Sequence, residues 1–206
     1  MKKKITTALA AGVLAFTMSA STSLAAFSDV SPRYEQEVNY LITNNYAQGI
    51  TSTTFGTTDS IKRIDAAVMV ARALGFNESS NLPDAGFTDV PASRAWAVNA
   101  LAARDVISGK TATQFGASDT MTRNEMAKVI AIAYGMETSL NPIPFTDVNE
   151  RFAPYVGALI QNEITQGKSS TKFGSTDPIT RGEFAIFVYK SEGLSKIEPP
   201  EVEEVS

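Results

Sequence analysis

The sequence contains no cysteine and no histidine among its 206 residues. Without cysteine, the chain can form no disulfide, no thiolate metal site and no thiol nucleophile. Without histidine, most catalytic triads and most transition-metal sites are excluded as well. Any catalysis would have to rest on carboxylates, lysine, serine or tyrosine, and we expect neither a metal nor a cofactor.

A long apolar run is also missing, and the one at the N-terminus is short. Residues 1–25 combine three lysines after Met1, an apolar stretch over residues 5–16 and the small-x-small sequence Ser23-Leu24-Ala25. This order is typical of a secretory signal peptide cut after Ala25, and the stretch is too short for a stable membrane span. We therefore expect a secreted chain with no membrane span, and the lack of cysteine favours a bacterial secretory route.

Basic residues are fewer than acidic residues. The whole chain has 18 basic and 22 acidic residues, which gives a net charge of −4. Removal of residues 1–25 takes away three lysines and no acid, so the mature chain carries 15 − 22 = −7. Nucleic-acid-binding proteins are usually basic, so we expect no nucleic-acid partner.

The chain repeats itself three times. The sequence Phe-x-Asp-Val recurs at residues 27, 87 and 145, and each copy is followed without gaps by a glycine 22 residues on, a Phe-Gly pair 28 residues on and an arginine 36 residues on. So many matches at fixed spacing indicate internal repeats, which we assign to residues 27–76, 87–136 and 145–194. The polar, proline-containing segments between them are typical of linkers. Residues 195–206 form an acidic tail or the start of a further domain.

Each repeat predicts two helices joined by a loop. Apolar residues at helical spacing follow Phe-x-Asp-Val, and a second such stretch follows the arginine. Gly49, Gly109 and Gly167 are predicted to close the first helices in the left-handed conformation, and Gly75, Gly135 and Gly193 are predicted to end the second helices. One helix–loop–helix unit cannot bury its apolar faces alone, whereas three can share a core. We therefore predict a mainly α fold built from three helix–loop–helix repeats.

The start of the second helix carries the most informative residues. Thr122 with Glu125, and Thr180 with Glu183, match the capping box, in which the threonine hydroxyl and the glutamate satisfy backbone N–H groups. Repeat one has Lys62 and Asp65 instead, so Ser60 or Asp59 is predicted to cap that helix. An arginine lies between the two capping positions in every repeat. It faces the positive end of the helix dipole, at a cost of about 0.3–1 kcal/mol, so it must have another role.

This combination of Phe-x-Asp-Val, apolar helix, glycine loop, Phe-Gly and Thr-Arg-x-Glu resembles the S-layer homology module, in three copies from Phe27 to Leu194. The resemblance implies a pseudo-threefold assembly with a central helical bundle and grooves between the repeats. With the signal peptide, it implies the N-terminal cell-wall anchor of a Gram-positive surface-layer protein. The implied ligand is pyruvylated secondary cell-wall polysaccharide linked to peptidoglycan.

The resemblance places Arg63, Arg123 and Arg181 at the binding grooves. A ketal-linked pyruvate presents a carboxylate, which a guanidinium binds in a bidentate fork, and a helix N-terminus offers spare N–H donors to the same anion. The simpler interpretation is an ion pair with a carboxylate of the neighbouring repeat. Repeat one lacks the capping Thr and Glu and so departs from the family pattern. The resemblance therefore supports ligand binding less strongly at Arg63 than at Arg123 and Arg181.

Three further residues are candidates for ligand contact. Lys110 and Lys168 follow the loop glycine in repeats two and three, where repeat one has Ile50, so the grooves are predicted to be unequal. The alternative is that both lysines are simply solvated. Trp96, the only tryptophan, either stacks on a sugar or packs in the core.

The aspartates are predicted to be structural. Asp29, Asp89 and Asp147 of Phe-x-Asp-Val are expected to act either as caps or as acceptors of hydrogen bonds in turns. Asp59, Asp119 and Asp177 are expected to stabilise the turn before the second helix. Calcium binding is the alternative for the second set, although the spacing of an EF-hand loop is absent.

Two other functions compete with a non-enzymatic anchor. A wall-active hydrolase could use Glu125 and Glu183 as a carboxylate pair, but capping already explains both residues. A structural protein–protein module in a surface lattice is the second alternative. Lattice contacts of surface-layer proteins usually use later domains, so we expect any lattice self-association to involve domains beyond residue 206.

Overall fold

The computed structural model describes residues 27–138 and 142–194. The expected signal peptide of residues 1–25 and the segment 195–206 lie outside the described residues. The described part contains six α-helices and one 3-10 turn: α1 (Glu35–Thr43), α2 (Arg63–Ala73), η1 (Ala92–Arg94), α3 (Ala95–Ala102), α4 (Arg123–Ala133), α5 (Ala153–Gln161) and α6 (Arg181–Ser191). Only isolated β-bridges accompany these helices in the described part, which confirms the predicted mainly α fold. Within the same residues, no helix has the length and apolarity needed to cross a membrane.

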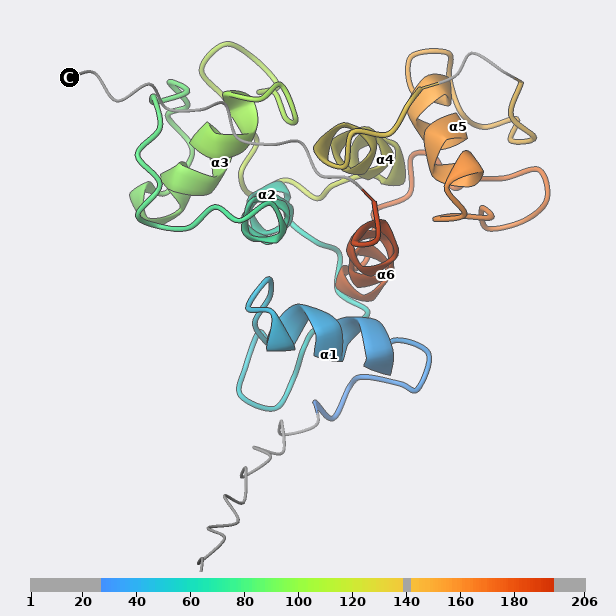
Figure 1. Ribbon diagram of the computed structural model, residues 1–206, viewed down its shortest axis with the longest axis horizontal. Coiled ribbons are helices and arrows are strands. Elements are labelled where there is room, and N and C mark those ends of the chain that lie inside the picture. The colour runs from blue at the N-terminus through green and yellow to red at the C-terminus, as the bar shows by residue number, and fades with distance from the viewer. Residues whose placement is uncertain (1–26, 139–141, 195–206) are drawn as a thin grey trace, which may run out of the picture.

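The second helices of the repeats form the centre of the molecule, and the first helices form three outer lobes. In Figure 1, α2, α4 and α6 are seen end-on in the middle, while α1, α3 and α5 lie around them. Helix α1 packs on α6, α3 on α2 and α5 on α4. Each outer helix therefore packs on the central helix of the preceding repeat, and repeat one packs on repeat three. The three repeats close into a ring with the predicted pseudo-threefold form.

A ring of three backbone hydrogen bonds marks the pseudo-threefold axis. The N–H of Ile61 donates to the carbonyl of Ile179 at 2.9 Å, that of Ile179 to Met121 at 2.9 Å, and that of Met121 to Ile61 at 3.0 Å. All three side chains are fully buried, so none of these backbone groups can turn to water instead. Because each repeat donates to one neighbour and accepts from the other, the ring needs all three repeats.

The aspartate of each Phe-x-Asp-Val motif holds the Phe-Gly loop of its own repeat. The carboxylate of Asp89 accepts the backbone N–H groups of Phe115, Gly116 and Ala117 at 2.7, 2.7 and 3.0 Å. Asp29 and Asp147 make the same three bonds in their repeats. The donors from Ala117 and Phe115 lower the pKa of Asp89 below its usual value. These aspartates thus act as turn acceptors, in the way the sequence predicts.

The glycines after the first helices have a different role from the predicted one. Asn45, Asp105 and Glu163 close these helices in the left-handed region, with φ of 59°, 55° and 59°. Gly109 is required for close packing instead, since a Cβ there would lie 2.3 Å from the ring of Phe87. Gly49 and Gly167 meet Phe27 and Phe145 in the same way. Gly167 also has the predicted left-handed backbone, with φ of 78°, although it lies beyond the residue that closes the helix. At the second helices, Gly75 and Gly135 do have positive φ, whereas Gly193 does not.

Candidate functional site

The N-termini of the three central helices define the site, and two of them carry the predicted cap. In α4, the hydroxyl of Thr122 accepts from the N–H of Glu125, and the Glu125 carboxylate accepts from the N–H of Thr122. Thr180 and Glu183 form the same capping box in α6. In α2 the cap position is Lys62, which makes no side-chain capping bond. The predicted cap by Ser60 or Asp59 is wrong, because both residues precede the cap position.

The first two N–H groups of each central helix are not spare donors for an anion. The first two N–H groups of α2, from Arg63 and Ile64, donate to the carbonyls of Asp119 and Ala117 in repeat two at 2.9 and 3.2 Å. The corresponding groups of α4 and α6 donate to repeats three and one. The prediction that these N–H groups bind a ligand is therefore wrong. The neighbouring Phe-Gly loop occupies the place of the anion.

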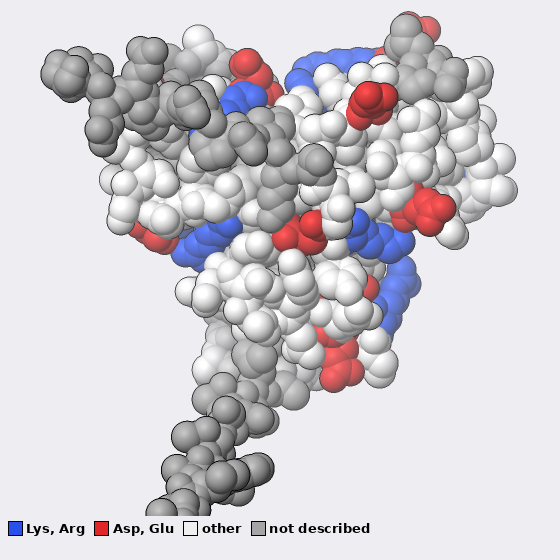
Figure 2. Space-filling view, viewed as in Figure 1, with Lys and Arg blue, Asp and Glu red and all other residues white. Residues whose placement is uncertain are grey.

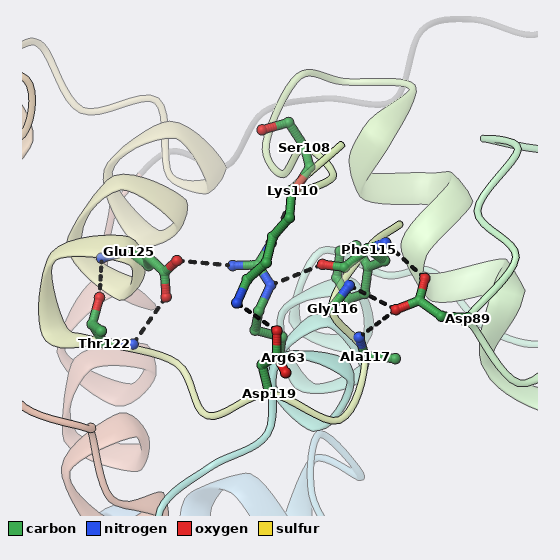
Figure 3. Close-up of polar contacts among 10 residues, drawn as sticks. All are labelled: Arg63, Asp89, Ser108, Lys110, Phe115, Gly116, Ala117, Asp119, Thr122 and Glu125. Carbon is green, nitrogen blue, oxygen red and sulfur yellow. Dashed lines mark hydrogen bonds and ion pairs between the residues drawn. The ribbon is translucent and has the colours of Figure 1, made fainter. Parts of the chain in front are cut away.

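The motif arginines reach across the same interfaces and are almost completely buried. Arg63 donates from Nε to the carbonyl of Phe115 at 3.1 Å and from Nη2 to that of Ser108 at 3.0 Å, and its guanidinium carbon lies 4.9 Å from the centre of the Phe115 ring (Figure 3). Arg181 donates in the same way to Phe55 and Gln48, and Arg123 donates from Nε to Phe173. Since the neighbouring backbone takes two of the three nitrogens of Arg63 and Arg181, the predicted bidentate fork is not free for a ligand.

Two of the arginines are also paired with the capping glutamate of the next repeat. The Nη1 atom of Arg63 lies 3.5 Å from Glu125, and that of Arg123 lies 3.1 Å from Glu183. Figure 3 shows Glu125 on one side of Arg63 and Phe115 on the other. Burial lowers the pKa of Arg123, and the charge of Glu183 offsets part of that effect. A guanidinium remains protonated in such a site.

Arg181 lacks this partner. Asp65 takes the position of the glutamate, and it forms an ion pair with Arg94 of repeat two instead. Arg181 makes no ion pair within the described residues, and its Nη1 atom has no hydrogen-bond partner there. Arg181, rather than Arg63, therefore has the exceptional interface. The loss of the capping glutamate in repeat one thus alters the ion pairing of Arg181 and not that of Arg63, and the weaker binding expected at the groove of Arg63 stays a prediction.

A cavity of about 280 Å³ opens beside Arg63, and we call it the Arg63 cavity. Its charged lining residues are Arg63, Lys110, Glu125, Lys128 and Arg151, and Phe152 lines it as well. Among the lining residues, four cations against one acid give a charge of 4 − 1 = +3 in a protein whose overall charge is negative, and one of the four, Lys110, is also paired with Asp119 outside the lining. Lys128 and Arg151 make no ion pair within the described residues.

Sequence reasoning missed Lys128 and Arg151 because neither recurs in all repeats. The positions equivalent to Lys128 hold Val68 and Ile186, and those equivalent to Arg151 hold Arg33 and Ser93. A comparison that looks for shared residues passes over such positions. The signal that could have revealed Lys128 is a basic residue five positions after the motif arginine of α4, where the other repeats have Val68 and Ile186.

A second cavity, of about 530 Å³, lies beside Arg181, and we call it the Arg181 cavity. Arg72, Arg94 and Arg181 line it together with Asp65 and Glu78, so its charge is 3 − 2 = +1. Trp96 lines this cavity and packs in the core at the same time, with 9% of its surface exposed. The two alternatives for Trp96 are thus compatible. Ile50, which is 53% exposed, also lines this cavity.

The remaining candidates lie at the mouths of the interfaces. Lys110 and Lys168 form ion pairs with Asp119 and Asp177, so neither lysine is merely solvated. Their partners are aspartates for which calcium binding was the alternative, and no group of acidic side chains in the described residues is arranged to hold a metal ion. At the third interface, Phe187 lies 5.4 Å from the guanidinium of Arg123.

Basic side chains appear at the seams between the three lobes, with acidic ones close by (Figure 2). This distribution agrees with the position of the two cavities, each of which is lined by residues from all three repeats. Part of the positive charge of the described residues is therefore presented where the repeats meet.

Comparison with known proteins gives matches along most of the repeats. Over 177 residues, 84% of this chain, it is 28% identical to the surface-layer 125 kDa protein of Lysinibacillus sphaericus. Over 111 residues, 52% of the chain, it is 35% identical to an endoglucanase of Bacillus sp. (strain KSM-635). The matched segments span only 14% and 10% of those two proteins. The S-layer homology domain family matches residues 26–67, 86–127 and 144–185. The chain belongs to the S-layer homology domain family, with three copies of the domain.

Proposed function

We propose that this chain anchors an exported surface-layer protein to the cell wall without a covalent bond. Its ligand is pyruvylated secondary cell-wall polysaccharide, which it binds in the cavities between repeats. Membership of the S-layer homology family and the similarity to a surface-layer protein support association with the cell wall. The observation that carries the proposal at the level of residues is the charge of +3 in the Arg63 cavity.

The side chains that contact the carboxylate are Lys128, Arg151 and Lys110 rather than the buried arginine. Arg63 uses Nε and Nη2 for backbone carbonyls, and Glu125 neutralises part of its charge. Lys128 and Arg151 have no carboxylate partner in the described residues and line the same cavity. A charge-assisted bond from either of them to a pyruvate carboxylate would be short and strong. Arg63 fixes the walls of the cavity by holding repeat two against repeat one.

The wall geometry also suits a sugar. Phe152 lines the Arg63 cavity, and Trp96 and Tyr46 line the Arg181 cavity, so each cavity combines aromatic surface with cations. Apolar walls with a few polar groups are the usual composition of ligand pockets. Occupation of both cavities by one polymer would raise the overall affinity through effective concentration.

An enzymatic role is not proposed. Glu125 and Glu183 are used by capping boxes and by ion pairs with Arg63 and Arg123. Neither carboxylate is available as the acid or base of a glycosidase pair. The activity named in the endoglucanase belongs to that protein, of which the matched segment is only 10%.

Calorimetric titration with purified wall polysaccharide, before and after chemical removal of pyruvate, tests the proposal. Lys128→Val and Arg151→Ser copy the residues of other repeats and should leave the fold intact. Each should weaken binding about tenfold, because a hydrogen bond to a charged group is worth roughly 1.5 kcal/mol or more. Depyruvylated polymer should not bind.

The matched control is Lys172→Thr, which also removes one positive charge and copies Thr54 of repeat one. Lys172 is exposed and lines neither cavity, so this variant should bind like the parent chain. Equal binding of the pyruvylated and depyruvylated polymers would overturn the proposal. Alanine at the three motif arginines is a poor test, since it removes contacts between repeats as well as charge.

A further inference from the structure

The interface between repeats one and two carries two cations that the equivalent interfaces lack. Lys62 stands where the other repeats have Thr122 and Thr180. Arg94 stands where they have Tyr34 and Phe152. The three repeats share one backbone design, so these equivalent positions act as internal controls for what the fold itself requires.

The fold does not explain Lys62. A lysine at the cap position provides no acceptor for the helix N–H groups, and its charge faces the positive end of the helix dipole. The side chain is exposed, and its ammonium makes no hydrogen bond or ion pair in the part of the chain that the structure describes. Repeat one thus gives up a capping box and gains a free cation at the surface.

A third cavity, of about 340 Å³, lies next to this lysine, and we call it the Lys62 cavity. Lys62, Asp65, Arg94 and Ser118 are among its lining residues. Asp65 and Arg94 line the Arg181 cavity too, so their ion pair forms the common wall of the two cavities. Both volumes lie near or within the range usual for small-molecule sites.

Arg94 can donate hydrogen bonds to an anion in either the Arg181 cavity or the Lys62 cavity. Its side chain is 44% exposed, and only Nη1 is used in the described residues, where it donates to Asp65. Its Nε and Nη2 atoms therefore remain for a ligand. A guanidinium is suited to such shared use, because its five N–H groups point in different directions in one plane.

We propose that the Arg181 cavity and the Lys62 cavity form one extended site for two carboxylates on neighbouring units of the same polymer. The first carboxylate binds at Arg181 and Arg72, and the second at Lys62 and Arg94. The inference rests on the proposed binding of pyruvylated polysaccharide. It adds that the joined Arg181 and Lys62 cavities recognise a two-unit segment, whereas the Arg63 cavity takes a single unit.

The fluorescence of Trp96 is a specific probe of this site, because Trp96 is the only tryptophan and lines the Arg181 cavity. The probes are wall polysaccharide fragments with one and with two pyruvylated units. The two-unit fragment should bind the parent chain several-fold tighter than the one-unit fragment. Lys62→Thr should lower the affinity for the two-unit fragment about threefold, as expected for the loss of one exposed ion contact. It should not change the affinity for the one-unit fragment.

Lys62→Thr supplies the capping threonine of the other repeats, so loss of folding cannot explain weaker binding. Arg94→Tyr, which copies Tyr34, should likewise reduce the two-unit preference, and Lys172→Thr should not. Equal affinity of the parent chain for both fragments, or an unchanged preference in Lys62→Thr, would overturn the extended site. Failure of the one-unit fragment to bind at all, in calorimetry as well as fluorescence, would overturn the proposed function instead.

Discussion

The interfaces of Arg63 and Arg181 share a backbone design and differ in electrostatics. Both arginines are buried, and both donate Nε to the carbonyl of a Phe-Gly phenylalanine and Nη2 to a loop carbonyl. At Arg63 the third nitrogen faces Glu125, while the surrounding cavity has three other cations. At Arg181 the third nitrogen has no acid partner among residues 27–138 and 142–194, and two acids are paired with other arginines.

This difference shows that the repeat in sequence is not the functional unit. Each interface combines the arginine of one repeat with the acid and loop of the next, so a substitution in repeat one alters the site of repeat three. Residues shared by all repeats build the scaffold, because every interface needs them. Residues found in only one or two repeats, such as Lys128 and Arg94, distinguish the cavities.

The largest expected effect comes from removal of the buried arginines. Arg63→Ala leaves Glu125 without its partner and two carbonyls without donors, which should lower the free energy of unfolding by about 3 kcal/mol. That is the low end for a broken buried pair, since Glu125 is partly exposed. Arg181→Ala leaves only carbonyls unpaired and should cost about 2 kcal/mol. Urea unfolding followed by circular dichroism measures both values.

Arg123→Ala is the matched control for this ranking. Arg123 has an ion pair with Glu183, so its loss should rank with that of Arg63 rather than that of Arg181. Equal costs for all three substitutions would mean that the glutamate pairs contribute nothing, and the electrostatic difference between the interfaces would not affect stability.

The second prediction transfers a cation from one cavity to the other. Val68 lines the Arg181 cavity at the position of Lys128. Val68→Lys should therefore raise the affinity of the Arg181 cavity for a one-unit pyruvylated fragment by about three- to tenfold, as for one added charge contact. Quenching of Trp96 during titration measures the affinity. Val68→Met adds bulk without charge, and an equal gain in that variant would contradict an electrostatic cause.

The fold could be predicted from the sequence because its determinants recur. Phe-x-Asp-Val, the Phe-Gly pair and the capping boxes of Thr122 and Thr180 each appear at fixed spacing, and each makes local or neighbouring contacts in the structure. Which helices pack together could not be predicted in this way. The packing of α1 on α6 joins the two ends of the repeat region, and no local pattern encodes such a contact.

The candidate site was predictable only in part. The motif arginines were located at the interfaces correctly, but the sequence could not show that backbone carbonyls occupy two of their nitrogens. Lys128 and Arg151 come from different repeats and meet only through the interleaved packing. The sequence associates the missing glutamate of repeat one with Arg63 of the same repeat. It does not reveal that Asp65 takes the position of that glutamate beside Arg181.

The third prediction concerns the ion pair that Arg181, unlike Arg63 and Arg123, does not make within the described residues. Asp65→Glu adds one methylene, which lets the carboxylate reach Arg181 as Glu125 reaches Arg63. An ion pair of this kind should add about 0.5–1 kcal/mol to stability, less the loss of the pair with Arg94. The same change should weaken anion binding at the Arg181 cavity, since it neutralises Nη1. Denaturation and Trp96 titration should move in opposite directions, and parallel changes would contradict the assigned pairing.

The smallest difference between the two interfaces is expected in how stability falls at acidic pH. Asp29 supports the loop that contacts Arg181, and Asp89 supports the loop that contacts Arg63. Desolvation raises the pKa of Asp29, but the backbone donors of its Phe-Gly loop together outweigh it and lower the pKa, and the equivalent donors of repeat two lower the pKa of Asp89. A carboxyl with a lowered pKa in the folded state stabilises the fold above its unfolded value, here 3.8, and loses that contribution as pH falls through the folded value. Stability should thus not depend on the protonation of these groups near pH 7 and should fall below about pH 4.

Asp29→Asn and Asp89→Asn should each flatten that fall in stability to a similar degree in urea unfolding series at low pH. An unequal change would show that the loops, and not only the cavity residues, distinguish the two interfaces.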